Sequence, residues 1–165
     1  MKKTIFVSLF LLLGSIPIYS QYVAGIGTYV SSPLAVNSKD ITNPDHFVYE
    51  VSLKAFTTAS HCFDIIGGFG KEYYNFTLMG EVHNPIAYPF DWYLGFGGHV
   101  GSWKKAHWND NAKHDNTFAG LDGTFGLQCT LAPIAISIGV RPVYNLYGGD
   151  QFYWLKQIGL HICFY

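Results

Sequence analysis

The chain has 165 residues and a formal net charge of −1, and only 13% of its residues are Asp, Glu, Lys or Arg. This charge is too sparse and too balanced for a nucleic-acid-binding surface, which needs a concentrated excess of Lys and Arg. The 49% hydrophobic and 18% aromatic content excludes intrinsic disorder, and the length corresponds to one domain.

The first twenty residues have the layout of a secretory signal peptide. Lys2 and Lys3 precede an apolar run over residues 5–13, and Ser20 offers a small residue at the cleavage point. The apolar run is too short for a transmembrane helix, which takes about 20 apolar residues. We expect cleavage after Ser20 and export of residues 21–165 as one domain.

The rest of the chain has apolar residues with a period of two, as in the run IAISIGVR that starts at Ile134. A period of two indicates β-strands rather than helices. Eight strands are predicted, at residues 22–30, 47–57, 60–71, 74–84, 91–103, 117–131, 133–145 and 152–165.

The connections between the predicted strands alternate in character. Those at one end are mostly polar, and two of them, 31–46 and 104–116, are long, whereas those at the other end are short or contain prolines. An even number of strands with one trimmed end and one end of longer polar loops is typical of a bacterial outer-membrane barrel. We therefore predict an all-β fold, an eight-stranded antiparallel up-and-down transmembrane β-barrel.

The two faces of the predicted strands differ in polarity. One face carries large apolar side chains suited to lipid, and the other carries small, polar and charged side chains suited to a narrow interior. The ionisable residues of the interior face are Glu50, Lys54, Asp64, Glu81, His83, His99, Asp122, Arg141 and His161. We interpret them as a structural polar network, with a salt bridge expected between Asp122 and Arg141 on neighbouring strands. Carboxylates beside a histidine are also compatible with acid–base catalysis, so a catalytic role is the alternative.

Three segments carry a family resemblance: WYLGFGGHVGSW, FAGLDGTFGLQCTLAPIAISIGVRPVYNL and GLHICFY. They resemble the last four strands of the small outer-membrane β-barrel proteins of the Bacteroidota, a porin-like family related in architecture to OmpX-like and OmpA-type barrels. The positions that match the family pattern are Asp122, Gly123, Gly126, Leu127, Pro133, Arg141 and Pro142. Gln128 and Cys129 stand where the family often has Glu and Tyr. The resemblance implies the fold and an outer-membrane location. It implies no particular activity, because function in this family is mostly unassigned.

The last residues resemble the signal that the outer-membrane assembly machinery reads. Gly159, Ile162 and Phe164 match its glycine, apolar and aromatic positions, and Tyr165 extends the signal by one residue. The expected partners are therefore this machinery, through its contact with the C-terminal segment, and outer-membrane lipid or lipopolysaccharide, through the apolar face.

The sequence contains no recognisable catalytic set. His99 and Ser102 are similar to the histidine and serine of lipid A deacylases, which are also eight-stranded barrels. A spacing of three residues places these two side chains on opposite faces of a strand, so they cannot reach each other as base and nucleophile. We expect no enzymatic activity and no cofactor.

The sequence shows no closed metal-ligand set and no disulfide framework, which leaves metal binding by loop 104–116 and a single disulfide as lesser alternatives. The loop 104–116 contains residue types that bind metals, but their spacing matches no closed ligand set. These residues are His107, Asp110, His114 and Asp115. Cys62, Cys129 and Cys163 are odd in number and widely spaced, which predicts three strand residues rather than a disulfide framework.

We expect a non-enzymatic integral outer-membrane protein with a structural, envelope or adhesion-type role, in which loops 31–46 and 104–116 contact any surface partner. Two alternatives stay open. One is an enzyme that modifies lipid A or phospholipid. The other is a soluble, lipocalin-like carrier of a small ligand, which would need charged residues outside its barrel and apolar residues inside.

Overall fold

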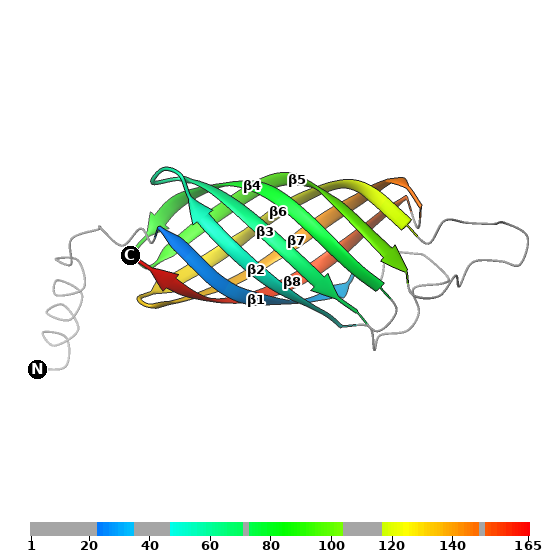
Figure 1. Ribbon diagram of the computed structural model, residues 1–165. Coiled ribbons are helices and arrows are strands. Elements are labelled where there is room, and N and C mark those ends of the chain that lie inside the picture. The colour runs from blue at the N-terminus through cyan, green and yellow to red at the C-terminus, as the bar shows by residue number, and fades with distance from the viewer. Residues whose placement is uncertain (1–22, 35–46, 71–72, 104–116, 149–150) are drawn as a thin grey trace, which may run out of the picture.

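The computed structural model describes residues 23–34, 47–70, 73–103, 117–148 and 151–165. Eight strands form a closed barrel in which each strand pairs antiparallel with the next and β1 closes onto β8 (Figure 1). The strands are β1 Ala24–Pro33, β2 Val48–Phe56, β3 His61–Phe69, β4 Tyr73–Ala87, β5 Phe90–Trp103, β6 Thr117–Leu131, β7 Ile134–Tyr147 and β8 Phe152–Phe164. In these ranges we find no helix of the length and apolarity that a membrane crossing requires. The predicted fold class is confirmed.

All eight predicted strands are present, and the ends of β1 and β4 differ most from the prediction. β1 continues to Pro33, which pairs with Leu155 of β8. β4 continues to Ala87, past a register shift between Pro85 and Ala87. We predicted that this strand ends at residue 84, before Pro85. Proline cannot donate a hydrogen bond to a neighbouring strand, but it is tolerated where the pairing is irregular, so β4 continues past Pro85.

The two ends of the barrel differ in their connections. Turns of a few residues join β2 to β3, β4 to β5 and β6 to β7, at the end where β1 begins and β8 stops (Figure 1). We call this the terminus-side end. The connections after β1 and β5 leave from the opposite, loop-side end. Most residues of the predicted loops 31–46 and 104–116 lie outside the described residues.

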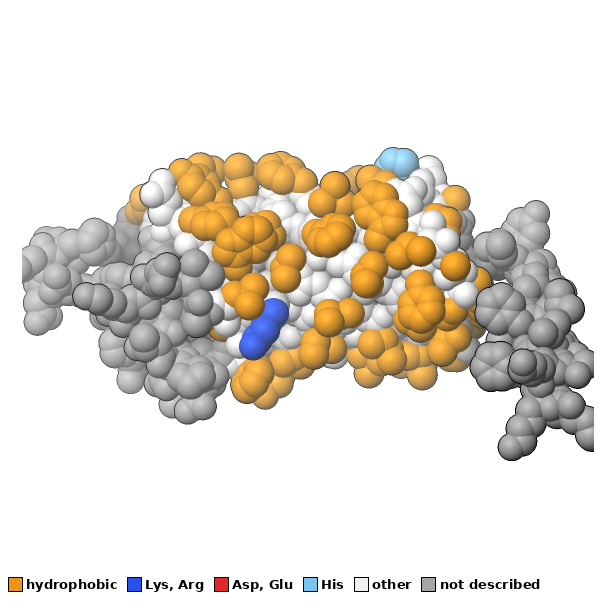
Figure 2. All heavy atoms as spheres, turned by 180° about the vertical axis from the view of Figure 1, so that it is seen from behind, with side chains coloured by type: hydrophobic (Ala, Val, Ile, Leu, Met, Phe, Trp, Pro, Cys, Tyr) orange, Lys and Arg blue, Asp and Glu red, His pale blue; other side chains and the backbone are white. Residues whose placement is uncertain are grey.

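Burial alternates along the strands, with apolar side chains outside and polar side chains inside. Phe96 and Ile138, in the middle of β5 and β7, are 65% and 64% exposed on the exterior. Figure 2 shows such side chains over one side of the barrel, with a basic side chain among them. Of the described residues, Lys156 is the only Lys or Arg that is exposed. This polarity is the reverse of what the lipocalin-like alternative requires.

Glycines on the interior face make room for aromatic rings. The Tyr93 ring lies against Gly126 of β6 and Gly139 of β7, and a Cβ atom built on Gly139 would lie 2.5 Å from the Tyr93 hydroxyl oxygen. Likewise, a Cβ on Gly159 of β8 would lie 2.5 Å from a carbon of the Tyr29 ring. An eight-stranded barrel has room for little more than its own side chains, so large interior residues need facing glycines.

Candidate functional site

The chemistry-bearing side chains of the described residues gather inside the barrel. The buried Asp, Glu, Lys, Arg and His residues are Glu50, Lys54, Asp64, Glu81, His83, His99, Asp122, Arg141 and His161. These are the same nine residues that the sequence pattern assigns to the interior. Four are acidic and only two are Lys or Arg, so the nine residues have a formal charge of −2 when the histidines are counted as neutral.

Lys54 lies at the centre of the terminus-side half of the interior. Its ammonium group forms an ion pair with Glu81 Oε2 and lies 3.5 Å from Asp64 Oδ2. It also lies 5.3 Å from the centre of the Tyr93 ring and 5.9 Å from that of Tyr29. One cation therefore serves two buried carboxylates, and the aromatic faces add further attraction for it.

Asp64 accepts two hydrogen bonds besides its contact with Lys54. Tyr29 Oη donates to Asp64 Oδ2 at 2.9 Å, and Ser52 Oγ donates to Asp64 Oδ1 at 2.5 Å. His161 Nε2 lies 3.0 Å from the same Ser52 oxygen. These contacts join β1, β2, β3 and β8 across the barrel interior.

Arg141 and Glu50 form the main ion pair toward the loop-side end. Arg141 Nη2 donates to Glu50 Oε1 at 2.5 Å, which connects β7 to β2. Ser31 Oγ donates to Glu50 Oε2 at 2.6 Å, and Gln157 Nε2 donates to the same oxygen at 3.2 Å. The prediction of a salt bridge between Asp122 and Arg141 is wrong, because the long Arg141 side chain reaches across the interior to Glu50.

Asp122 instead contacts a histidine of the neighbouring strand. His99 Nδ1 lies 2.7 Å from Asp122 Oδ1, and His99 Nε2 lies 2.8 Å from Asn145 Oδ1. Both ring nitrogens of His99 therefore have a hydrogen-bond partner. This chain of contacts links β5, β6 and β7 near the loop-side end.

Ser52, His161 and Asp64 are the residue types of a hydrolytic triad, but their hydrogen-bond order differs. In a triad the carboxylate orients the histidine, and the histidine takes the serine proton. Here the serine proton points at Asp64, and His161 Nδ1 is buried with no partner among the described residues. The exposed fraction of all three residues is 0%, so the set is enclosed within the barrel. The arrangement suits a structural contact rather than acyl transfer.

The catalytic pair considered in the sequence analysis, His99 and Ser102, lies apart as expected. His99 is buried in the interior, whereas Ser102 is half-buried on the alternate parity of β5. His99 has Asp122 and Asn145 as its hydrogen-bond partners.

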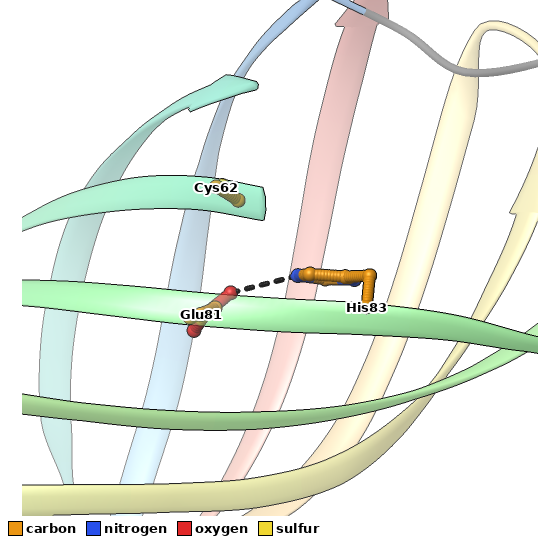
Figure 3. Close-up of side chains that lie close together, drawn as sticks. All are labelled: Cys62, Glu81 and His83. Atoms are coloured by element: carbon orange, nitrogen blue, oxygen red, sulfur yellow. Dashed lines mark hydrogen bonds and ion pairs between the residues drawn. The ribbon is translucent and has the colours of Figure 1, made fainter. Parts of the chain in front are cut away.

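A group of three metal-binding residue types, Cys62, Glu81 and His83, was missed as a unit by the sequence analysis. Glu81 and His83 share one face of β4, and the β3–β4 register places Cys62 opposite Glu81 (Figure 3). Their ligand atoms all lie within 4.8 Å of one another. Folding the predicted hairpin about its short turn would have revealed this proximity, because Cys62 and Glu81 lie almost equally far from that turn.

The other predicted site residues are distributed as follows. Gly159 is buried, and Ile162, Phe164 and Tyr165 are exposed at the terminus-side end of β8. All three cysteines are free, with Cys62 and Cys163 buried and Cys129 half-buried on the outward-facing parity. The loop residues His107, Asp110, His114 and Asp115 lie outside the described residues.

Known structures share this architecture, although no protein-family model and no curated protein matches the sequence. The N-terminal β-barrel domain of Pseudomonas aeruginosa OprF superimposes with a TM-score of 0.66 at 13% identity, over 86% of this chain and 96% of that one. Neisserial surface protein A gives 0.60 at 13% identity, over 86% and 96%. The outer membrane enzyme PagL gives 0.53 at 8% identity, over 84% and 98%. The fold is that of the small outer-membrane β-barrels.

Proposed function

We propose that the protein is an integral outer-membrane β-barrel with a non-enzymatic structural, envelope or adhesion-type role. The observation that carries the proposal is the polarity of the barrel, whose exterior is apolar along the strands and whose interior is polar. Soluble monomers rarely expose a contiguous apolar patch larger than a few hundred Å². A lipid bilayer removes the cost of such a surface, and a closed barrel leaves no strand edge unpaired within it.

In this proposal the chain is exported, residues 1–20 are removed, and residues 21–165 insert into the outer membrane. Gly159, Ile162, Phe164 and Tyr165 form the segment that the assembly machinery binds. The outward positions of Ile162, Phe164 and Tyr165 favour this role. Gly159 also has a structural reason to be glycine, since the Tyr29 ring occupies the space beside it. The resemblance of the second half of the chain to the small Bacteroidota barrels supports the proposal that the protein is one of them.

The loop-side end faces the cell exterior in this arrangement. Loops 31–46 and 104–116 are then the surfaces for an external partner, because long loops on a rigid scaffold commonly carry binding. Outer-membrane lipid, including lipopolysaccharide, is the partner of the strand exterior. The non-enzymatic role is favoured because the interior carboxylates and histidines contact one another in a structural network.

Fractionation of cells that express the protein tests its location. We expect recovery in the outer membrane and a change in gel mobility between unboiled and boiled samples, because a closed barrel stays folded in detergent until it is heated. Recovery as a soluble periplasmic or secreted protein would contradict the proposal and favour a ligand carrier.

Lipid analysis of the same cells tests the non-enzymatic role. We expect the acyl-chain composition of lipid A and phospholipid to be the same with and without the protein when both are measured by mass spectrometry. A deacylated or re-acylated lipid that appears only with the protein, and is lost on Ser52→Ala substitution, would establish the enzymatic alternative. Antibody binding to an epitope inserted in loop 104–116 of intact cells then tests the orientation.

A further inference from the structure

The group of Cys62, Glu81 and His83 stands at the terminus-side end of the barrel interior (Figure 3). Cys62 is the second residue of β3, and the other two project from β4. Each residue is at most 5% exposed. A thiol, a carboxylate and an imidazole are the side chains that bind Zn²⁺ in proteins.

The charge around this group favours a bound cation. Lys54 is shared between Glu81 and Asp64, so two buried carboxylates have one permanent positive charge between them. His83 Nε2 lies 2.9 Å from the Glu81 oxygen that Lys54 also contacts. A divalent ion here would neutralise the unmatched carboxylate and a Cys62 thiolate together, whereas without it the excess charge is costly in a low-dielectric interior.

The His83 ring is held in place and has hydrogen-bonding capacity left over. It stacks on Tyr93 with ring centres 5.4 Å apart and contacts Phe56 edge-on. Its Nδ1 atom is buried and has no hydrogen-bond partner among the described residues. The nitrogen that faces Glu81 is Nε2, so an ion bound by Glu81 and Cys62 would be coordinated through this nitrogen of a ring already fixed in place.

We propose that Cys62, Glu81 and His83 form a binding site for Zn²⁺ or a similar borderline-soft divalent ion at the terminus-side mouth of the barrel. Binding replaces the thiol proton of Cys62 with a metal–sulfur bond, and the proton leaves to solvent. Lys54, displaced from Glu81 by the ion, moves toward Asp64, its other carboxylate neighbour. Water completes the coordination, and the ion fastens β3 to β4.

The geometry requires only small movements. Tetrahedral zinc with bonds of about 2.0–2.3 Å places its ligand atoms roughly 3.3–3.8 Å apart. The ligand atoms of the three residues now lie within 4.8 Å of one another. Side-chain rotations that move these atoms by about 1 Å bring them into the range for zinc. No strand has to shift, because the register already places Cys62 opposite Glu81.

Cobalt titration of the full mature chain, folded in detergent micelles, tests the site. Co²⁺ stands in for Zn²⁺ and gives a near-ultraviolet sulfur-to-cobalt charge-transfer absorption when a thiolate binds it. We expect one Co²⁺ per barrel with this absorption, its loss when Zn²⁺ is added, and its absence in Cys62→Ser. Glu81→Gln and His83→Gln each weaken binding at least tenfold, since each removes one ligand.

Three variants serve as matched controls. Cys163→Ser changes another buried thiol and Cys129→Ser changes an exterior one, and both should retain the absorption. His107→Ala combined with His114→Ala removes the imidazoles of loop 104–116 and should also retain it. Survival of the absorption in Cys62→Ser, or its loss in the loop variant, would overturn the proposal.

A second measurement uses the wild-type chain alone, in case a variant does not fold. Zn²⁺ should slow alkylation of Cys62 at least tenfold while it leaves the alkylation of Cys129 unchanged, as read by mass spectrometry of the folded barrel. Equal rates with and without Zn²⁺, in a sample whose unboiled gel mobility shows it to be folded, would overturn the site. This result would leave the proposed outer-membrane role untouched, because that role does not depend on the metal.

Discussion

The two halves of the barrel interior solve the same electrostatic problem in different ways. Toward the loop-side end each carboxylate has a partner of its own, Arg141 for Glu50 and His99 for Asp122. Toward the terminus-side end Lys54 is shared between two carboxylates. The carboxylates of the loop-side half need no further partner. Those of the terminus-side half depend on Lys54 alone for a permanent positive charge, and Cys62 and His83 lie where a second cation would bind.

The difference follows from the length and placement of the basic side chains. Arg141 reaches across the interior from β7 to β2, and so it ends at one carboxylate. Lys54 stands between β3 and β4 carboxylates and contacts both. Burying a charge is tolerated only when it is paired, so removal of Lys54 and removal of Arg141 should have unequal effects on stability.

Substitution of Lys54 should have the largest effect. Lys54→Met leaves Asp64 and Glu81 buried without their shared cation, which we expect to lower the free energy of unfolding by about 5 kcal/mol. Urea unfolding of the barrel in lipid vesicles, followed by unboiled gel mobility, measures the change. Lys54→Arg should keep most of the stability, and the double variant Lys54→Met with Glu81→Gln should recover part of the loss. A loss below about 1 kcal/mol would show that the two carboxylates do not depend on Lys54.

Substitution of Arg141 should cost less. Arg141→Met leaves only Glu50 unpaired and also removes two buried donors, Nε and Nη1, that have no partner among the described residues. We expect a loss of about 3 kcal/mol in the same assay. Adding Glu50→Gln to this variant should restore stability, since the buried charge is then gone. A double variant less stable than the single one would disprove the pairing.

The His99 contacts should contribute less again, because they are hydrogen bonds near the loop-side end. His99→Leu removes the hydrogen bonds from His99 to Asp122 and to the Asn145 oxygen, with an expected loss of about 2 kcal/mol. Asp122→Asn keeps an acceptor oxygen for His99 and should cost about 1 kcal/mol. The temperature at which each variant loses the gel mobility of the folded barrel ranks the variants. A larger loss of stability for Asp122→Asn than for His99→Leu would contradict the assigned contacts.

The exterior supplies the smallest effect, and its sign is opposite. Lys156 is the exposed basic residue on the apolar surface of β8, in register with Val140 of β7 and Ser32 of β1. Lys156→Leu should stabilise the barrel in vesicles by up to about 1 kcal/mol, because a lysine on the lipid face is unfavourable. Destabilisation by this substitution would show that Lys156 has a favourable contact at the membrane surface.

The sequence predicted the strands and their faces because both depend on the chain's own period-two pattern. Alternation such as Ile136, Ser137, Ile138 determines which side chains enter the interior wherever one face must be apolar. The partners inside the barrel could not be predicted in the same way. Glu50 and Arg141 are 91 residues apart, and they meet only because the barrel closes and its strands are staggered.

The environment of the exterior side chains tests the central claim most directly. Nitroxide labels can be attached at Phe96→Cys and Ile138→Cys, with Thr58→Cys in the exposed β2–β3 turn as the control and Ser in place of the three native cysteines. We predict that oxygen, which concentrates in hydrocarbon, relaxes the Phe96 and Ile138 labels in reconstituted vesicles, and that a water-soluble nickel complex relaxes only the label at Thr58. Equal access of the nickel complex to Ile138 and Thr58 would mean that the exterior faces water, and the account of a membrane barrel would be wrong.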